Sequence, residues 1–168
     1  VVTIFMILFG VNFSAYFLIL RKKFKQAFSM EEVRVYVLII LVSIAVIAVM
    51  IKDMYGSIGT AVQQAAFQVG SIITTTGFAT TDFNLWPEVP RTILVLLMFV
   101  GACAGSTGGG IKVSRLVILL KTVKKELHTL LHPRSLRKLQ MDGHLLEHET
   151  VRATNVFLVA YVLTFVFS

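Results

Sequence analysis

The chain has 168 residues, of which 56% are hydrophobic and only 15% are charged, and its mean hydropathy is +0.81. A soluble domain has about 25% charged residues, so this composition excludes an ordinary soluble enzyme and predicts an integral membrane protein. The formal net charge of +7 does not indicate nucleic-acid binding, because the basic residues gather in two clusters beside apolar runs. We therefore expect membrane lipid, and no nucleic acid, around this protein.

The first apolar run, residues 1–20, is long enough for one membrane-spanning helix, which needs about 20 residues. The positive-inside rule places its far end in the cytoplasm, because the run is followed by Arg21, Lys22, Lys23 and Lys25. Since the chain begins with Val and stops within an apolar run, we expect it to be an excerpt of a longer protein.

A second apolar run, residues 33–51, follows Ser29 and Glu32, whose S-x-x-E spacing predicts a capping box at the start of a helix. Residues 57–69 then carry Thr and Gln among Ala, Ile and Phe. About 12 helical residues extend roughly 18 Å, which enters a bilayer without crossing it. We interpret this segment as a pore helix that enters from outside; the alternative is an amphipathic surface helix.

The pore helix leads into residues 68–78, Q-V-G-S-I-I-T-T-T-G-F, which are too polar to cross a bilayer. Irregular backbone at membrane depth survives only where protein or a water-filled path satisfies its polar groups. A ring of carbonyl oxygens that replaces the water around a cation is one use for such backbone. We interpret five residues as one segment of an ion selectivity filter: Thr74, Thr75, Thr76, Gly77 and Phe78.

The next loop, residues 79–90, has two acidic and no basic residues, which suits the outer side, and Trp86 is predicted to be an interfacial anchor. From Thr92 an apolar helix runs back inward, is interrupted at residues 101–110 and resumes at Ile111. Three consecutive glycines cost a helix about 1 kcal/mol each relative to Ala. The break therefore predicts a cavity-lining loop or hinge.

We favour a flexible loop beneath the filter that obstructs the ion path and moves to open it, made of Gly105, Ser106, Thr107, Gly108, Gly109 and Gly110. The alternative is close helix packing through the GxxxG pattern of Gly101 and Gly105. A nucleotide-binding loop is disfavoured, because Ile111 stands where that motif requires lysine.

A second basic cluster, again cytoplasmic, consists of Lys121, Lys124, Lys125, His128, His132, Arg134, Arg137 and Lys138. His128 and His132 have the i, i+4 spacing of a metal pair, although a solvated helix end, stopped by Pro133, is the preferred interpretation. Asp142-Gly143 predicts a hairpin within residues 136–146, a natural docking surface for a soluble partner. Residues 151–167 begin another apolar span.

The hairpin also contains an H-x-x-E-H pattern, from His144 to His148, which in zinc proteases lies on one long helix. A membrane zinc protease is therefore a rival interpretation, disfavoured because His144 is expected on a hairpin strand. We expect no enzyme activity.

With these residues in view, the chain resembles the Trk/Ktr/HKT superfamily of potassium transporters, and within it the bacterial TrkH/KtrB membrane subunits. The resemblance covers nearly the whole chain. It is specific at S-I-I-T-T-T-G-F-A-T-T-D-F-N-x-W-P (71–87), at G-A-C-A-G-S-T-G-G-G-I-K-V-x-R (101–115) and at H-P-R (132–134).

The resemblance implies four helix–pore loop–helix repeats in one chain around a central pore. Residues 1–28 would be the end of one repeat, and residues 29–131 would form a complete repeat. Residues 132–150 would be a cytoplasmic linker with the hairpin, and residues 151–168 would begin the next repeat. Potassium would bind the carbonyls of Thr75, Thr76 and Gly77, and the gate would be Gly105 to Gly110, with Lys112 of the same motif.

The resemblance further implies a homodimer in a bacterial inner membrane with a cytosolic nucleotide-binding regulatory subunit of the TrkA/KtrA kind. Apart from potassium as substrate, it implies no cofactor. The expected fold is an all-α integral membrane protein with a re-entrant filter segment and a glycine-broken inner helix. The nearest rival is one subunit of a homotetrameric potassium channel.

Overall fold

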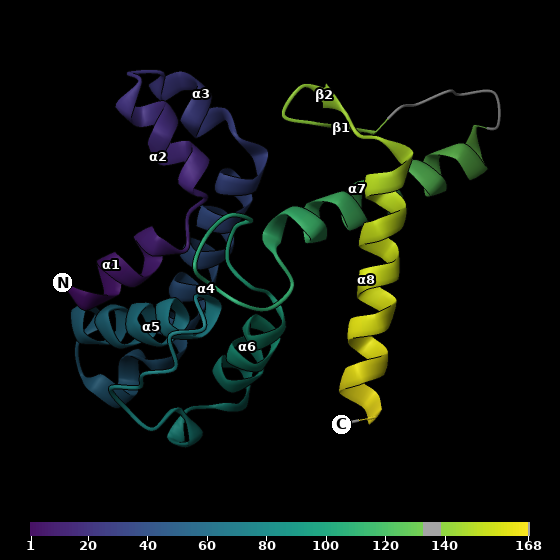
Figure 1. Ribbon diagram of the computed structural model, residues 1–168. Coiled ribbons are helices and arrows are strands. Elements are labelled where there is room, and N and C mark those ends of the chain that lie inside the picture. The colour runs from purple at the N-terminus through teal and green to yellow at the C-terminus, as the bar shows by residue number, and fades with distance from the viewer. Residues whose placement is uncertain (133–138, 168) are drawn as a thin grey trace. The chain divides into compact units, whose positions relative to one another are not determined.

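The computed structural model describes residues 1–132 and 139–167 (Figure 1). The elements are α1 (Val2–Phe9), α2 (Phe13–Leu20), α3 (Phe24–Ser29), α4 (Glu31–Tyr55), α5 (Ile58–Ile73), the short 3₁₀ helix η1 (Phe83–Leu85), α6 (Glu88–Phe99), α7 (Val113–Leu131), β1 (Gln140–Met141), β2 (His144–Leu145) and α8 (His148–Phe167). The predicted helical membrane fold is confirmed. The predicted helix stop at Pro133 and the basic residues Arg134, Arg137 and Lys138 lie outside the described residues.

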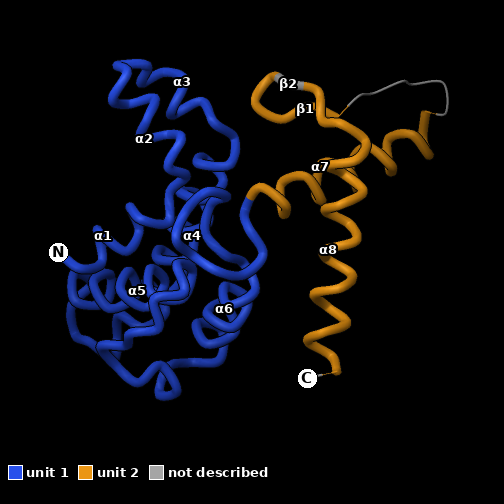
Figure 2. The backbone as a smooth tube through the Cα atoms, in the orientation of Figure 1, with its two compact units in different colours: residues 1–113 blue, residues 114–168 orange. Residues whose placement is uncertain are grey.

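The chain forms two compact units, residues 1–113 and 114–168 (Figure 2). Helix α4 in the first unit and helix α8 in the second unit are each long and apolar enough to cross a membrane. The predicted repeat boundaries at residues 28/29, 131/132 and 150/151, which the family resemblance implies, are a different division of the chain and stay a prediction.

Residues 1–20 do not form one straight helix as predicted: α1 and α2 meet at an angle of 96°. Asn12 starts a new helix, because its side chain accepts a hydrogen bond from the Ser14 N–H at 2.8 Å. At the end of α1 two tyrosine hydroxyls donate in addition to backbone N–H groups: Tyr36 to the Ile7 carbonyl at 3.0 Å and Tyr16 to the Leu8 carbonyl at 2.5 Å. The break therefore leaves these carbonyls hydrogen-bonded.

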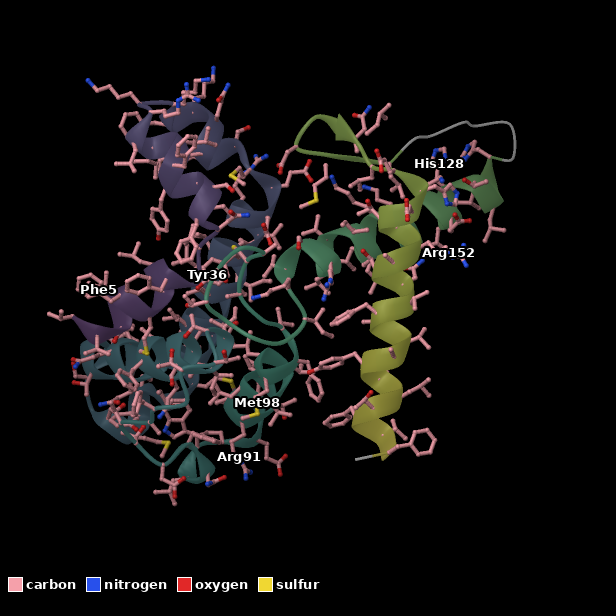
Figure 3. The ribbon with its side chains drawn as sticks, viewed as in Figure 1. Phe5, Tyr36, Arg91, Met98, His128 and Arg152 are labelled. Carbon is pink, nitrogen blue, oxygen red and sulfur yellow. The ribbon has the colours of Figure 1, made fainter. Side chains whose placement is uncertain are left out.

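Gly10 lies at this break beside the fully buried Tyr36, which Figure 3 labels. A Cβ at Gly10 would lie 2.1 Å from the Tyr36 hydroxyl oxygen. We therefore expect Gly10→Ala to destabilise the full-length protein by roughly 1–3 kcal/mol, measured as a lower thermal midpoint in detergent. The matched control is Gly59→Ala in α5, where the nearest atom, Ser57 Oγ, is 3.7 Å away. Equal midpoints for the two variants would contradict the close packing at Gly10.

The predicted capping box at Ser29 and Glu32 is wrong. Helix α4 has Met30 at its N-cap with no side-chain capping bond, and the Ser29 carbonyl accepts from Arg34 at 3.1 Å. The Glu32 carboxylate is only 3% exposed and accepts from the Ala104 N–H at 2.5 Å and from Asn12 Nδ2 at 3.2 Å. A buried carboxylate needs such partners, and these lie far away in the sequence.

The helix predicted over residues 57–69 is confirmed as α5, which is longer than predicted and lies against α4 and α1 (Figure 1). Four residues spaced four apart, Ala61, Ala65, Val69 and Ile73, are fully buried. In the second half of α5 Gln68, Gly70 and Ser71 are buried as well. Burial on several faces argues against the amphipathic surface helix, which would bury one face only.

Trp86 is not the predicted interfacial anchor. Its side chain is 2% exposed, and its indole N–H donates to the Tyr55 hydroxyl at 3.1 Å. The bond fastens the loop between α5 and α6, which contains η1, to the last turn of α4.

In the second unit the predicted hairpin is confirmed, with Gln140 opposite Leu145 and Met141 opposite His144. Asp142 and Gly143 both have positive φ, 52° and 80°, as a type I′ turn requires. Lys121 of α7 donates to the Gln140 carbonyl at 2.6 Å and so holds the hairpin on α7.

Candidate functional site

The predicted filter segment begins where α5 ends at Ile73. The chain turns sharply there: the Thr76 N–H donates to the Ser71 carbonyl at 2.8 Å, and Thr75 and Gly77 have φ of 56° and 81°. A β-branched residue at positive φ is strained and persists only when its surroundings hold it. Thr75 is held by its N–H, which donates to the Ile72 carbonyl at 3.0 Å, and by its hydroxyl, which donates to the Thr74 carbonyl at 2.7 Å.

Three side chains of α5 form hydrogen bonds with the non-helical segment that follows this turn. The Ser71 hydroxyl donates to the Phe78 carbonyl at 2.5 Å, and Gln68 Nε2 donates to the Thr81 carbonyl at 2.9 Å. Gln64 accepts from the Thr80 hydroxyl at 2.6 Å. Sequence reasoning noted polar residues in this helix but assigned them no role. The available signal was the i, i+4, i+7 spacing of residues 64, 68 and 71, which places them on one helix face.

The carbonyls of Thr75, Thr76 and Gly77 differ from the neighbouring carbonyls in their hydrogen bonding. Among the described residues, none donates a hydrogen bond to these three carbonyls, and all three residues are exposed. The carbonyls of Thr74 and Phe78, which were also predicted filter residues, accept hydrogen bonds within the protein. Three open carbonyls beside the negative end of the α5 dipole form an arrangement that can ligate a cation.

The glycine-rich segment forms a closed loop between α6 and α7. The Gly101 N–H donates to the Ile111 carbonyl at 2.8 Å, and the Ile111 N–H donates to the Phe99 carbonyl at 3.2 Å. A Cβ at Gly101 would lie 1.9 Å from the Gly109 carbonyl oxygen, so only glycine fits. Gly101 and Gly105 both lie outside helices, which excludes GxxxG helix packing.

The loop reaches the filter turn. The Gly109 N–H donates to the Thr75 hydroxyl at 2.8 Å, and a Cβ at Gly108 would lie 3.4 Å from the Thr74 carbonyl oxygen. Lys112 donates to the Gly108 carbonyl. The structure thus brings together the two segments that the sequence analysis proposed as filter and gate, together with Lys112.

This contact gives a direct prediction for Thr75. Thr75→Val removes the hydroxyl that accepts from Gly109 while keeping the shape of the side chain. We expect higher ion flux through the full-length protein under conditions that close the gate. Thr75→Ser, which keeps a hydroxyl, is the matched control and should behave as wild type. Equal basal flux in the two variants would show that this bond does not hold the loop.

The rival metal sites receive no support from the structure. Within residues 1–132 and 139–167, no group of three or more His, Cys, Asp or Glu side chains is placed to hold a metal ion. The rings of His128 and His132 stack with their centroids 4.7 Å apart. His144 lies on β2 and His148 begins α8, so the H-x-x-E-H pattern does not occupy one helix as a zinc protease requires.

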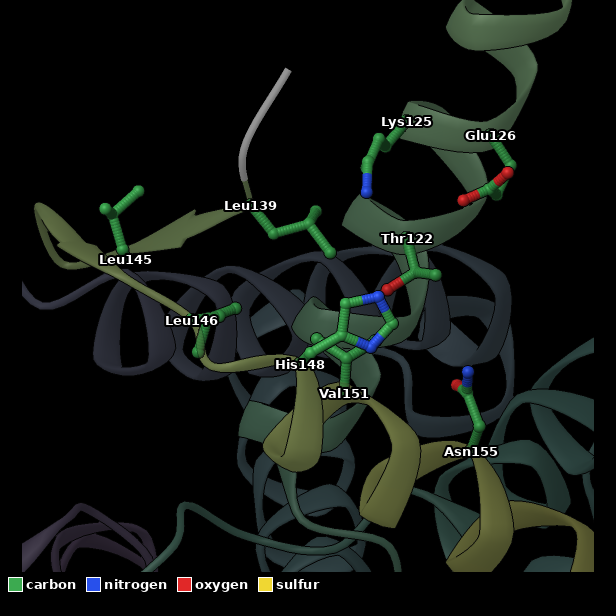
Figure 4. A pocket seen from close by; sticks show the side chains of 9 residues that line it. All are labelled: Thr122, Lys125, Glu126, Leu139, Leu145, Leu146, His148, Val151 and Asn155. Atoms are coloured by element: carbon green, nitrogen blue, oxygen red, sulfur yellow. The ribbon is translucent and has the colours of Figure 1, made fainter. Parts of the chain in front are cut away.

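His148 instead lines a cavity of about 350 Å³ within the second unit (Figure 4). Helix α7 contributes Thr122, Lys125 and Glu126, and the rest of the lining comes from Leu139, Leu145, Leu146, Val151 and Asn155. The mixed apolar and polar lining includes one acidic side chain and does not form a catalytic metal centre.

The family model described as "TrkH: Cation transport protein" matches residues 1–168. The chain belongs to the TrkH family. The TrkH family resemblance inferred from the filter and loop motifs is therefore confirmed, and with it a membrane protein of a cation transport family rather than an enzyme.

The chain is similar to known TrkH-family proteins over its whole length. It is 34% identical to the Trk system potassium uptake protein TrkH of Salmonella typhimurium over 100% of this chain and 35% of that protein. It is also 34% identical to TrkG of Escherichia coli K12, over 97% of this chain and 34% of that protein. The crystal structure of the potassium transporter TrkH from Vibrio parahaemolyticus matches with a TM-score of 0.89 and 34% identity, over 98% of this chain and 36% of that one. The chain thus spans about a third of the length of these relatives.

Proposed function

We propose that this chain is the part of a potassium uptake protein that contains one filter segment and the loop that gates the pore. The observation that carries the proposal is the set of three open carbonyls at Thr75, Thr76 and Gly77, which lie beside a loop that bonds to Thr75. Carbonyl oxygens replace the hydration shell of potassium in selective pores. The names of the relatives, Trk system potassium uptake proteins, support potassium as the cargo.

In this proposal residues 29–131 are one complete repeat of a longer, multi-pass chain in a bacterial inner membrane. The relatives are about three times as long as this chain, which spans 35% of them; this favours several repeats in one chain over a homotetrameric channel. A homodimer and a cytosolic nucleotide-binding regulatory subunit complete the proposed assembly. The term "system" in the relatives' names agrees with more than one component.

Rubidium uptake tests this function. The full-length gene is expressed in potassium-starved cells that lack their own uptake systems, with and without the regulatory subunit. We expect rubidium to accumulate and potassium to compete better than sodium. Well-expressed protein that takes up no rubidium in either condition would overturn potassium uptake as the function.

A further inference from the structure

The two halves of the glycine-rich loop are held differently. Residues 101–105, the anchored limb, bond to the break between α1 and α2: the Cys103 N–H donates to the Gly10 carbonyl at 3.0 Å, and the Phe13 N–H donates to the Gly105 carbonyl at 3.2 Å. The Ala102 carbonyl accepts from the Val113 N–H at 3.2 Å. Residues 101–103 are buried.

Residues 106–110, the filter-facing limb, are less buried and have fewer bonds to the neighbouring helices. Three of its five residues are exposed, and within the described part of the chain its one hydrogen bond to the filter segment runs from the Gly109 N–H to the Thr75 hydroxyl. The Thr107 hydroxyl reaches the Phe9 carbonyl only at 3.4 Å. Its other bonds are local, from the Ser106 hydroxyl to the Cys103 carbonyl and from Lys112 to the Gly108 carbonyl. Movement of this limb therefore breaks fewer bonds to the neighbouring helices than movement of the anchored limb.

Glu32 connects the anchored limb to two helices. It lies in the first turn of α4, its Oε1 accepts from the Ala104 N–H, and its Oε2 accepts from Asn12 Nδ2. Asn12 at the same time caps α2 through its other amide atom. Burial of a carboxylate is costly unless it is hydrogen-bonded, and here the bonds tie α2, α4 and the loop to one point.

We propose that Glu32 is a positioning residue of the gate: it fixes residues 101–105 against the α1–α2 break and so confines opening to residues 106–110. This inference rests on the proposed function, in which the loop closes the ion path. It adds a residue from outside the loop, on the helix that precedes the pore helix.

The reactivity of Cys103 tests the anchoring without any assumption about the cargo. Cys103 is 0% exposed and lies next to Ala104 on the anchored limb. The purified full-length protein is treated with N-ethylmaleimide, and modification is followed on the peptide that contains Cys103. We expect Glu32→Ala to speed modification about tenfold, the effect of one lost hydrogen bond to a charged group.

Three variants complete the design. Glu32→Gln should react much more slowly than Glu32→Ala, because its amide oxygen still accepts from the Ala104 N–H although its NH2 group cannot accept from Asn12. Asn12→Ser keeps an oxygen to cap α2 but loses the donor to Glu32, so its rate of Cys103 modification should lie between those of wild type and Glu32→Ala. This variant replaces Glu32→Ala in the test if Glu32→Ala does not fold. Asp53→Ala, at the exposed far end of α4, is the matched control and should leave Cys103 protected.

Basal rubidium uptake is measured on the same variants and should rise in Glu32→Ala but not in Glu32→Gln. Unchanged Cys103 modification in Glu32→Ala, or equal acceleration in the Ala and Gln variants, would overturn the anchoring. Faster modification without higher basal uptake, in a protein whose wild type transports rubidium, would overturn the role in gating. A wild type without uptake would instead refute the proposed function, while the Cys103 rates still decide whether Glu32 fixes the limb.

Discussion

Gly77→Ser in the full-length protein is expected to lower the preference for potassium over sodium about tenfold while the protein continues to transport. Gly77 has φ of 81°, and an L-residue in the left-handed region costs roughly 1–2 kcal/mol, of which about 1.4 kcal/mol corresponds to a tenfold change in an equilibrium. Relief of this strain would move the carbonyls of Thr76 and Gly77 away from the positions that a dehydrated potassium ion requires.

The measurement is the inhibition of rubidium uptake by sodium. The matched control is Gly56→Ser, because Gly56 also has a positive φ, 64°, and no atom within 4 Å of an added Cβ, as is true of Gly77. Gly56 ends α4, away from the filter. If sodium inhibited the Gly77 and Gly56 variants equally, the loss would reflect backbone strain in general, and the filter assignment would be wrong.

Deletion of residues 105–110 is expected to raise basal uptake several-fold. The deletion removes the Gly109 donor to Thr75 and the Gly108 carbonyl that accepts from Lys112, so nothing of the filter-facing limb stays below the open carbonyls. Bonds between Gly101 and Ile111 and between Ile111 and Phe99 close the base of the loop outside the deleted residues, which favours a folded product.

The control for the deletion is Ser106→Ala, which removes only the hydrogen bond from Ser106 to the Cys103 carbonyl and keeps the loop length. It should show wild-type uptake. The deletion protein should elute as a single species in size-exclusion chromatography and should still prefer potassium. These two results would distinguish an open gate from a misfolded protein. Unchanged or lower uptake by such a protein would contradict gating by this loop.

Local patterns were sufficient to predict the pore helix, the turn after it, the glycine break and the hairpin. Each depends on residues close together in the sequence: Gly77 at positive φ, the glycines that close approaches require, and Asp142-Gly143 in a type I′ turn. Their physical cause is the backbone conformation that glycine allows and other residues resist.

The predictions that were wrong concern residues whose partners lie far away in the sequence. Glu32 satisfies the spacing of a capping box, yet its partner Ala104 lies 72 residues away. Trp86 has the composition of an interfacial anchor, yet it bonds to Tyr55, 31 residues away. The break at Gly10 was missed because residues 1–20 together are apolar and long enough for one span, although Asn12 before Phe13 was a possible N-cap signal.

The most direct test of the filter is the position of a bound ion. Crystals of the full-length protein grown with rubidium or thallium are predicted to show anomalous density within coordination distance of the carbonyls of Thr75, Thr76 and Gly77, and none there in sodium alone. Strong density elsewhere in the pore, with no peak at these three carbonyls, would contradict the account.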